Sequence, residues 1–270
     1  MKRNLKLLSV TILIVTLLAG CGASSGQGGD EKADVKKKDT LTVAYSRDAR
    51  VLDPQMTGED GSSNALMPVI ENLVMYNAKN ELVPCLAESW EMIDNMTWKF
   101  NLRKGVKFHN GEEMKASDVV FSMKRATQPF AAQVQYIMKM IDPEGCKVVD
   151  DYTVIIKTNV PFAAFVGYMP YVGAGIVSEK AYKLDEGSDN PVGTGPYKFV
   201  SWEKGNKITY ERFDDYWGEK AKFKNLVIRC IPEPNSRLIE LETGGVDIAV
   251  GMTINEKAKV EANPDLKFLT

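Results

Sequence analysis

The sequence predicts a mixed α/β fold. Segments in which apolar and polar residues alternate, such as Leu41–Tyr45, interleave with segments of helical spacing, such as the stretch from Ser117 to Met123. The chain has no internal repeat, no P-loop and no dinucleotide-binding motif, and such interleaving without a strict repeat is typical of mixed α and β architectures. About 230 residues follow Asp39, which is enough for one large domain or two smaller ones.

The individual elements follow from periodicity and turn residues. A polar, Gly- and Pro-containing stretch at 46–63 predicts a loop, and apolar spacing predicts helices over 65–74, from 117 and over 236–243, with a polar helix after residue 250. Residues 98–102 and 106–108 read as a hairpin around Arg103-Lys104-Gly105. Further strands are expected at 41–45, 147–158 (two strands), 197–202, 207–210, 226–232 and 246–250, and the tail 265–270 is strand-like.

The N-terminus predicts export. Basic residues precede the apolar run Leu7–Leu18, which is shorter than the roughly 20 residues that span a bilayer and fits a signal peptide over 1–20. The run ends in Leu18-Ala19-Gly20-Cys21, which resembles a bacterial lipobox, so we expect lipidation at Cys21. The alternatives are an ordinary signal peptide with Cys21 as a bystander, or an uncleaved membrane helix. Residues 21–39 are rich in Gly, Ser and charge and predict a flexible linker.

Composition and residue counts limit the chemistry. The formal net charge of −2 gives no indication of a nucleic-acid partner. The single histidine, His109, follows a predicted strand at a turn, and the chain lacks both a G-x-S-x-G nucleophile motif and paired zinc-ligand spacing. We therefore expect no enzyme activity, no cofactor and no metal site. Cys85, Cys146 and Cys230 leave disulfide pairing open.

Seven segments in order resemble the peptide/nickel class of extracellular solute-binding proteins, the family of dipeptide- and oligopeptide-binding lipoproteins. The resemblance runs from Leu41 to about Val250, and its strength lies in the order of the motifs because each one alone is weak. They are Leu52-Asp53-Pro54, Val83–Glu91, Trp98–Glu112, Ala116–Ser122, Pro191–Tyr197, Asp215–Gly218 and Glu242–Ile248.

The resemblance implies a two-lobed periplasmic-binding-protein-like fold of class II, peptide-binding type, with a cleft that closes around its ligand. Family members are much longer, so the second lobe is expected to be missing from this chain, which is predicted to be C-terminally truncated. The first lobe, incomplete, would comprise 40–72 and 188–270, and 73–187 would form an inserted subdomain.

The resemblance also implies ligand-binding residues. The loop after the first strand contributes to the cleft in this family, and the stretch around Tyr171 faces it, with Phe130 and Tyr136 as further candidates. The nickel-binding branch places an arginine in the stretch aligned with Tyr171, and no arginine occurs here between Arg125 and Arg212, which argues against nickel. The loop residues are Met56, Thr57, Gly58, Glu59 and Asp60.

The sequence thus predicts a substrate-binding lipoprotein of an ABC importer. It would be a monomer, held to the outer side of the cell membrane by lipid (or in the periplasm if an outer membrane is present), and would deliver di- or oligopeptides to permease subunits. Three alternatives stay open: another cargo such as a nickel chelate, glutathione or an oligosaccharide; a truncated fragment without a transport role; and a lipid-anchored surface hydrolase, which would have to use His109.

Overall fold

The computed structural model describes residues 38–269. The predicted signal peptide, the lipobox with Cys21 and nearly all of the predicted linker lie outside the described residues. No helix within 38–269 is long and apolar enough to cross a membrane. The described part contains two main sheets and a short hairpin.

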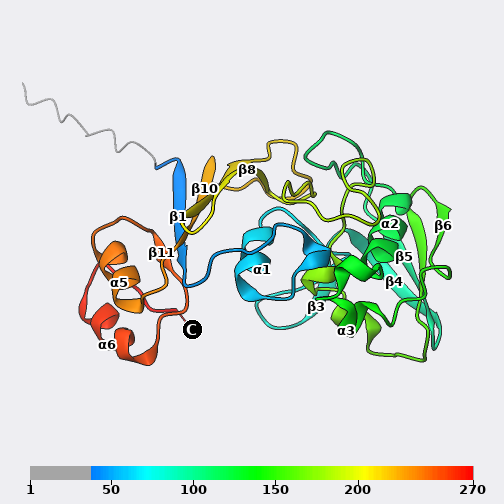
Figure 1. Cartoon of the computed structure of the whole chain (residues 1–270), viewed down its shortest axis with the longest axis horizontal. Coiled ribbons are helices and arrows are strands. Elements are labelled where there is room, and N and C mark those ends of the chain that lie inside the picture. The colour runs from blue at the N-terminus through cyan, green and yellow to red at the C-terminus, as the bar shows by residue number, and fades with distance from the viewer. Residues whose placement is uncertain (1–37, 270) are drawn as a thin grey trace, which may run out of the picture. The chain divides into compact units, whose positions relative to one another are not determined.

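The larger sheet has five strands in the order β11-β1-β10-β9-β8 (Figure 1). Strand β1 (Thr40–Tyr45) pairs in parallel with β10 (Asn225–Cys230) and β11 (Ile248–Ala249). The antiparallel strands β9 (Lys207–Arg212) and β8 (Tyr197–Glu203) extend the sheet beyond β10. Alternate residues of β9 and β10 are buried, which is why their periodicity was readable.

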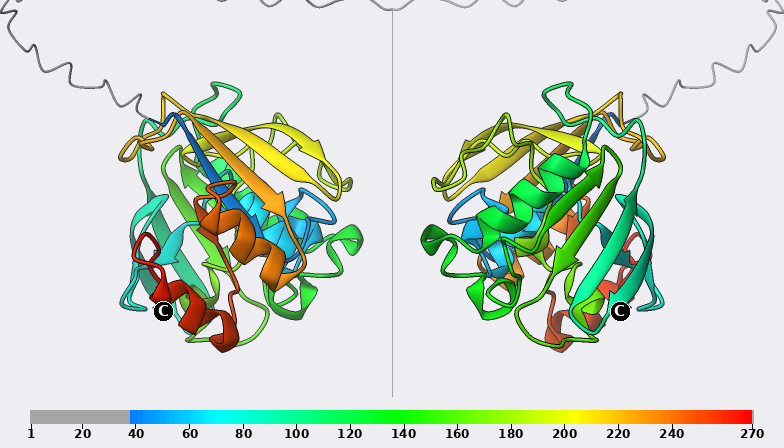
Figure 2. Two further views of the ribbon diagram at one scale, coloured as in Figure 1. Left: turned by 90° about the vertical axis from the view of Figure 1, so that its left-hand side faces the viewer. Right: turned by 90° about the vertical axis from the view of Figure 1, so that its right-hand side faces the viewer.

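Helix α5 (Pro234–Glu242) connects β10 to β11, as a crossover between parallel strands requires. It has Pro234 at its first turn and is followed by Gly244 at φ 75°, both standard boundary features. Helix α6 (Ile254–Ala262) begins with a capping box of Thr253 and Glu256. Helix α5 packs against α6 and β11, as the left view of Figure 2 shows.

The second sheet is antiparallel, with the order β4-β5-β7-β6. Helix α2 (Ala116–Ala126) packs against β6 and β7. The hairpin of β2 (Val74–Tyr76) and β3 (Leu82–Pro84) precedes this sheet in the chain. The sheet strands are β4 (Ala87–Asp94), β5 (Thr97–Leu102), β6 (Lys147–Asp150) and β7 (Thr153–Lys157).

Short helices connect these layers and carry much of the candidate site. Each of the two sheets has its own apolar core: Phe100 and Met123 are fully buried in the core of the smaller sheet, and Leu66 and Tyr210 in that of the larger. The short elements are η1 (Pro54–Met56), α1 (Asp60–Leu66), η2 (Pro129–Ala131), α3 (Gln135–Met138), α4 (Phe165–Tyr168) and η3 (Val172–Ala174).

Four local predictions were wrong. Helix α1 covers 60–66 instead of 65–74, because Glu59 caps it inside the predicted loop. Residues 106–108 form no hairpin with β5, whose neighbours are β4 and β7, and Lys107 makes only an isolated bridge to Glu113. The strand predicted over 246–250 is reduced to Ile248–Ala249, and no strand is assigned over 265–269.

The predicted division at residues 72/73 and 187/188 stays a prediction. The five-stranded sheet draws its strands from 40–45 and 197–249, and the four-stranded sheet draws its strands from 87–157.

Candidate ligand-binding site

The segment that follows β1 is held by its own side chains. The Asp53 carboxylate accepts a hydrogen bond from the Gln55 amide at 3.0 Å and so caps η1. Farther along, the Glu59 carboxylate accepts from the amides of Gly61 and Ser62 at 2.9 and 2.7 Å and caps α1. Burial raises the pKa of Glu59, but the hydrogen bonds from Ser62 and Gly61 and the nearby charge of Arg50 together outweigh it, so the pKa is lowered.

A fully buried ion pair anchors this segment to helix α2. The Arg125 guanidinium donates to both carboxylate oxygens of Asp53, at 2.8 and 2.6 Å, and neither side chain is exposed. Arg125 also donates to Gln55 and to the carbonyls of Lys183 and Glu186, at 2.8 and 2.6 Å. A bidentate, charge-assisted arrangement of this kind fixes the relative positions of three chain segments.

A cavity of about 320 Å³ lies beside this anchored segment. One side comes from the loop before α1 and from α1 itself, and the other from the stretch that leads into η3. The Gln55 amide side chain donates to the carbonyl of Gly175 at 2.9 Å and links η1 to the end of η3. The cavity is lined by Gly58, Asp60, Ser63, Leu66, Met67, Ile70, Asn72, Pro170, Tyr171 and Val172.

Four of the sequence-predicted residues come together here. Gly58, Asp60 and Tyr171 line the cavity, and the ring of Tyr136 meets that of Tyr171 edge-on with centroids 5.5 Å apart. A Cβ atom at Gly58 would lie 2.7 Å from the Tyr171 hydroxyl, so the close approach requires glycine. Burial raises the pKa of Tyr171, and the neighbouring hydroxyl of Tyr136 raises it further.

The other four predicted residues lie outside the cavity lining. Thr57 is buried and accepts a hydrogen bond from the Glu59 amide at 3.3 Å, and Glu59 caps α1. Met56 approaches Gly187, and the Phe130 ring lies 4.7 Å from the Arg125 guanidinium carbon. These contacts support the segment that carries the cavity.

Sequence reasoning missed most of the apolar wall. Leu66, Met67 and Ile70 occur at helical spacing and were predicted as part of a helix, and their recurrence was the one available indication that they share a face. Asn72, Pro170 and Val172 had no local indication, because they reach the cavity only through the tertiary approach of two distant segments.

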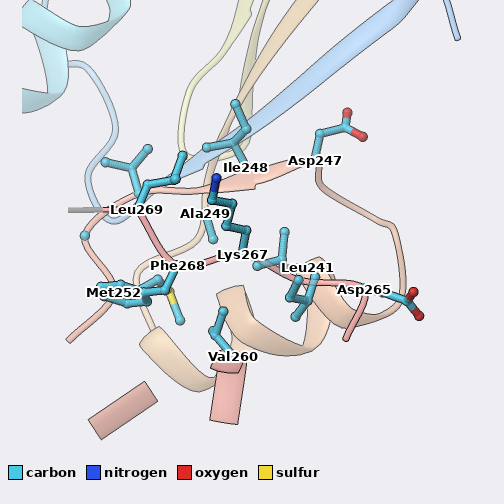
Figure 3. Close-up of a pocket in the computed structure, with 13 residues that line it drawn as sticks. Leu241, Asp247, Ile248, Ala249, Met252, Val260, Asp265, Lys267, Phe268 and Leu269 are labelled. Carbon is cyan, nitrogen blue, oxygen red and sulfur yellow. The ribbon is translucent and has the colours of Figure 1, made fainter. Parts of the chain in front are cut away.

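A second cavity of about 500 Å³ contains none of the predicted site residues (Figure 3). Ile248 and Leu269 line it on one side and Leu241 and Val260 from the two helices on the other. The Asp247 carboxylate at its edge accepts from the Lys38 ammonium at 2.5 Å and from the Thr42 amide at 2.8 Å. That carboxylate is therefore used in hydrogen bonds to residues in and beside β1 of the larger sheet.

The backbone at residues 193–195 passes directly against that of Pro68 and Val69, and two side chains from distant segments, Glu71 and His109, pack against it. The Glu71 carboxylate accepts from Thr194, Tyr216 and Trp217 at 2.7, 2.8 and 2.9 Å, and burial raises its pKa. The His109 ring donates through Nε2 to the carbonyl of Gly195 at 2.9 Å. Gly193 and Gly195 admit no Cβ, which would lie 2.1 and 2.5 Å from the carbonyls of Val69 and Pro68.

These contacts give His109 a packing role. Its Nδ1 accepts from the Gly193 amide at 3.4 Å, and its ring meets Phe213 edge-on. Burial lowers the pKa of His109 to about 4. The neutral ring that this geometry requires is held between backbone groups, so its contacts do not resemble those of a general base paired with a nucleophile.

The three cysteines of the described part are free thiols. Burial raises the pKa of Cys85 to about 12 and that of Cys146 to about 11. No group of three or more His, Cys, Asp or Glu side chains within residues 38–269 is arranged to hold a metal ion.

The fold is a mixed α/β arrangement with a cavity beside an anchored loop, and the family follows from comparison. Residues 81–270 match the model of the bacterial extracellular solute-binding proteins, family 5 (middle region), and the chain belongs to this family. Members of this family are extracellular or periplasmic solute-binding proteins.

Individual relatives agree with this assignment. The oligopeptide-binding protein OppA of Bacillus subtilis is 28% identical and covers 99% of this chain, and the dipeptide-binding protein of Escherichia coli is 34% identical over 75% of it. The structure of DppA from Helicobacter pylori in complex with the peptide STSA superposes with a TM-score of 0.75 at 30% identity, over 84% of this chain and 49% of that one.

The chain spans about half the length of the curated relatives it matches, 53% of OppA and 45% of the dipeptide-binding protein. Other relatives are named for heme, glutathione and nickel. The relatives are named as binding proteins, which supports a non-enzymatic role at the level of the family.

Replacing Arg125 by Met is expected to destabilise the fold by about 3–5 kcal/mol, because the Asp53 carboxylate would stay buried without its counter-charge. Lys183→Met is the matched control, since its ion pair with Glu186 is exposed and contributes at most about 1 kcal/mol. Urea unfolding at pH 7 measures both. An Arg125→Met variant no less stable than the Lys183→Met control would contradict the anchoring role.

The pKa of His109 is expected at about 4 and not at its ordinary 6.5. Because the folded pKa lies below the unfolded one, the stability contributed by the neutral ring is complete above pH 6.5 and is lost as pH falls towards 4, by about 3 kcal/mol. The chain has one histidine, so a single imidazole NMR resonance reports the titration.

The same loss of stability at low pH is expected when the unfolding free energies of the wild type and of His109→Asn are compared across pH 4 to 7. The difference between the two curves removes the opposing contribution of Glu71, whose raised pKa favours the fold at lower pH. A resonance that titrates near 6.5 would show that the ring is solvated.

Proposed function

We propose that the chain belongs to a lipoprotein that captures di- or oligopeptides outside the cytoplasmic membrane and delivers them to the permease of an ABC importer. The observation that carries this proposal is the cavity lined by Gly58, Asp60 and Tyr171, which combines an apolar wall with the polar side chains of Asp60, Ser63 and Asn72 beside an anchored loop. Protein pockets for small ligands commonly combine apolar walls with a few fixed polar groups.

The names of relatives add support. OppA, whose match covers 99% of this chain, is named for oligopeptides, and the H. pylori structure contains a peptide. We further propose that residues 40–72 and 188–270 act as a first lobe carrying the subdomain 73–187, and that the protein works as a monomer. The absence of arginine between Arg125 and Arg212 favours peptide over a nickel complex as cargo.

Peptide capture predicts saturable binding of a defined pool of di- to pentapeptides with a dissociation constant near 1 μM, about −8 kcal/mol. Isothermal titration calorimetry on the purified full-length lipoprotein measures it, with glutathione, heme and a nickel–histidine complex as competitors. At a free ligand concentration 100 times the dissociation constant, binding also stabilises the fold by about 2.7 kcal/mol. If a competitor binds saturably and no peptide binds, the peptide assignment is wrong and the cargo is that competitor.

Lipid anchoring at Cys21 is a separate part of the proposal. A Cys21→Ser variant expressed in a bacterium is expected to lose both incorporation of labelled fatty acid and attachment to the membrane fraction. Cys230→Ser is the matched control, because that residue is a free thiol in the folded part. Unchanged membrane attachment of the Cys21 variant would mean that another segment holds the protein.

A further inference from the structure

The described part of the chain begins beside a group of exposed lysines. Strands β1 and β10 are parallel and in register from Thr40 and Asn225, so both begin at the same end of the larger sheet (Figure 1). The amides of Lys224 and Asn225 donate to the carbonyl of Asp39 at 2.9 and 3.0 Å. The stretch Lys220–Lys224 therefore leads directly to the start of β1, where the predicted linker joins the folded part.

Lysines alternate with other residues along this stretch, which reads Lys220-Ala221-Lys222-Phe223-Lys224, and the lysines are exposed. The residues between them are fixed to the sheet through their backbone. The carbonyl of Ala221 accepts a hydrogen bond from the Arg212 guanidinium of β9 at 3.3 Å. The carbonyl of Phe223 accepts from the Tyr197 hydroxyl of β8 at 3.1 Å. The lysines are therefore presented to solvent from a backbone that the sheet holds in place.

The positive charge of this stretch is only partly paired. Lys220 and Lys222 form no ion pair with the residues of 38–269, and the exposed acid beside them is Glu219. Lys224 pairs with Asp39 at 3.1 Å, but the two side chains are 63% and 56% exposed, so the pair is weak. The other acids of the loop before the stretch have partners of their own. They are Asp214, which pairs with Arg212 at 2.9 Å, and Asp215, which pairs with Lys107 at 3.1 Å.

An anionic membrane surface is the partner that this group fits. Clusters of basic residues beside a membrane anchor bind negatively charged lipid headgroups, and each lysine that reaches them raises the affinity about 5-fold. Asp39, Glu219 and Asp247 offset part of the charge, so the contact is weak by itself. Together with the two lysines that directly precede the described residues, the group comprises Lys36, Lys37, Lys38, Lys220, Lys222 and Lys224.

A lipid anchor at Cys21 makes a weak contact sufficient. A Gly/Ser-rich chain as long as residues 21–37 has an end-to-end distance of about 23 Å, so the anchor confines the start of β1 to a thin layer above the membrane. Tethering over such a length gives effective concentrations on the order of millimolar, at which modest affinities are occupied. The loop that carries the cavity follows the opposite end of β1, so the contact does not use the cavity residues.

We propose that the lysines at the start of β1 and β10 form a surface that rests on anionic lipid headgroups beside the lipid anchor. The inference rests on the lipid anchoring that is part of the proposed function, and it adds an orientation to it. The end of the larger sheet at which β1 and β10 begin faces the membrane. The residues of this surface in the described part are Lys38, Lys220, Lys222 and Lys224.

The test uses the acylated full-length protein, reconstituted into vesicles of phosphatidylcholine alone or of an equal mixture with phosphatidylglycerol. A water-soluble amine-reactive reagent labels exposed lysines, and mass spectrometry of the peptides gives the labelling rate at each one. Lys220 and Lys222 are expected to be labelled about 5-fold more slowly on the anionic vesicles, the factor for one lysine at the headgroups. Salt at about 1 M should remove this protection, because it shortens the Debye length to about 3 Å.

Two comparisons separate this contact from general shielding by the bilayer. Lys79 and Lys139 are matched controls within the wild type, because both are exposed and belong to other parts of the fold, and their labelling should be equal on the two kinds of vesicle. A variant with Lys220→Gln and Lys222→Gln should lose the protection of Lys224 on anionic vesicles. A variant with Lys79→Gln and Lys139→Gln should keep it.

Equal labelling of Lys220 and Lys222 on the two kinds of vesicle, with the protein attached to both, would overturn the inference while lipid anchoring stood. Equal protection of Lys79 and Lys139 on the anionic vesicles would overturn it as well, since the shielding would not belong to one surface. If the protein attaches to neither kind of vesicle, the proposed anchoring fails and this contact fails with it.

Discussion

The buried ion pair between Asp53 and Arg125 is the interaction on which the candidate site depends. Asp53 uses its carboxylate three times, for the guanidinium, for the Gln55 amide and for the Ser188 amide at 2.8 Å. Arg125 in turn holds two carbonyls of the 183–186 segment. Removing two charges from water is costly, so the pair contributes position more than net stability. The loop that leads to Gly58 therefore starts from a fixed base.

Among the described residues, the contacts around 193–195 contain no ion pair and rely on neutral hydrogen-bond donors. The neutral donors Thr194, Tyr216, Trp217 and Cys85 surround the Glu71 carboxylate, and a neutral His109 ring bridges two backbone groups. Tyr210 adds a hydrogen bond from the larger sheet to the carbonyl of Ala65 at 2.7 Å, which seats α1 under that sheet. The ion pair and these neutral contacts together hold the segment 53–72, which forms one side of the cavity, near both of its ends.

Much of the fold was predictable because its strands have one buried face. Strands β8, β9 and β10 and helix α5 followed from periodicity and turn residues. Helix α1 was not predictable, because the sequence Asp60–Leu66 is mostly polar and its start depends on the Glu59 cap. The hairpin at 98–108 failed because Gly105, at φ 73°, marks a turn without specifying which strands pair. Asp53 and Arg125 are 72 residues apart, beyond any local pattern.

The three free thiols have a consequence for folding outside the cytoplasm, where members of this family work. Oxidation and disulfide exchange require the thiolate, and burial keeps Cys85 and Cys146 protonated once the chain has folded. Their vulnerable period is therefore the interval between export and folding, when all three are exposed and could be cross-linked wrongly. Folding therefore shields Cys85 and Cys146 from oxidation, whereas Cys230 stays partly exposed in the folded protein and is the thiol most open to it.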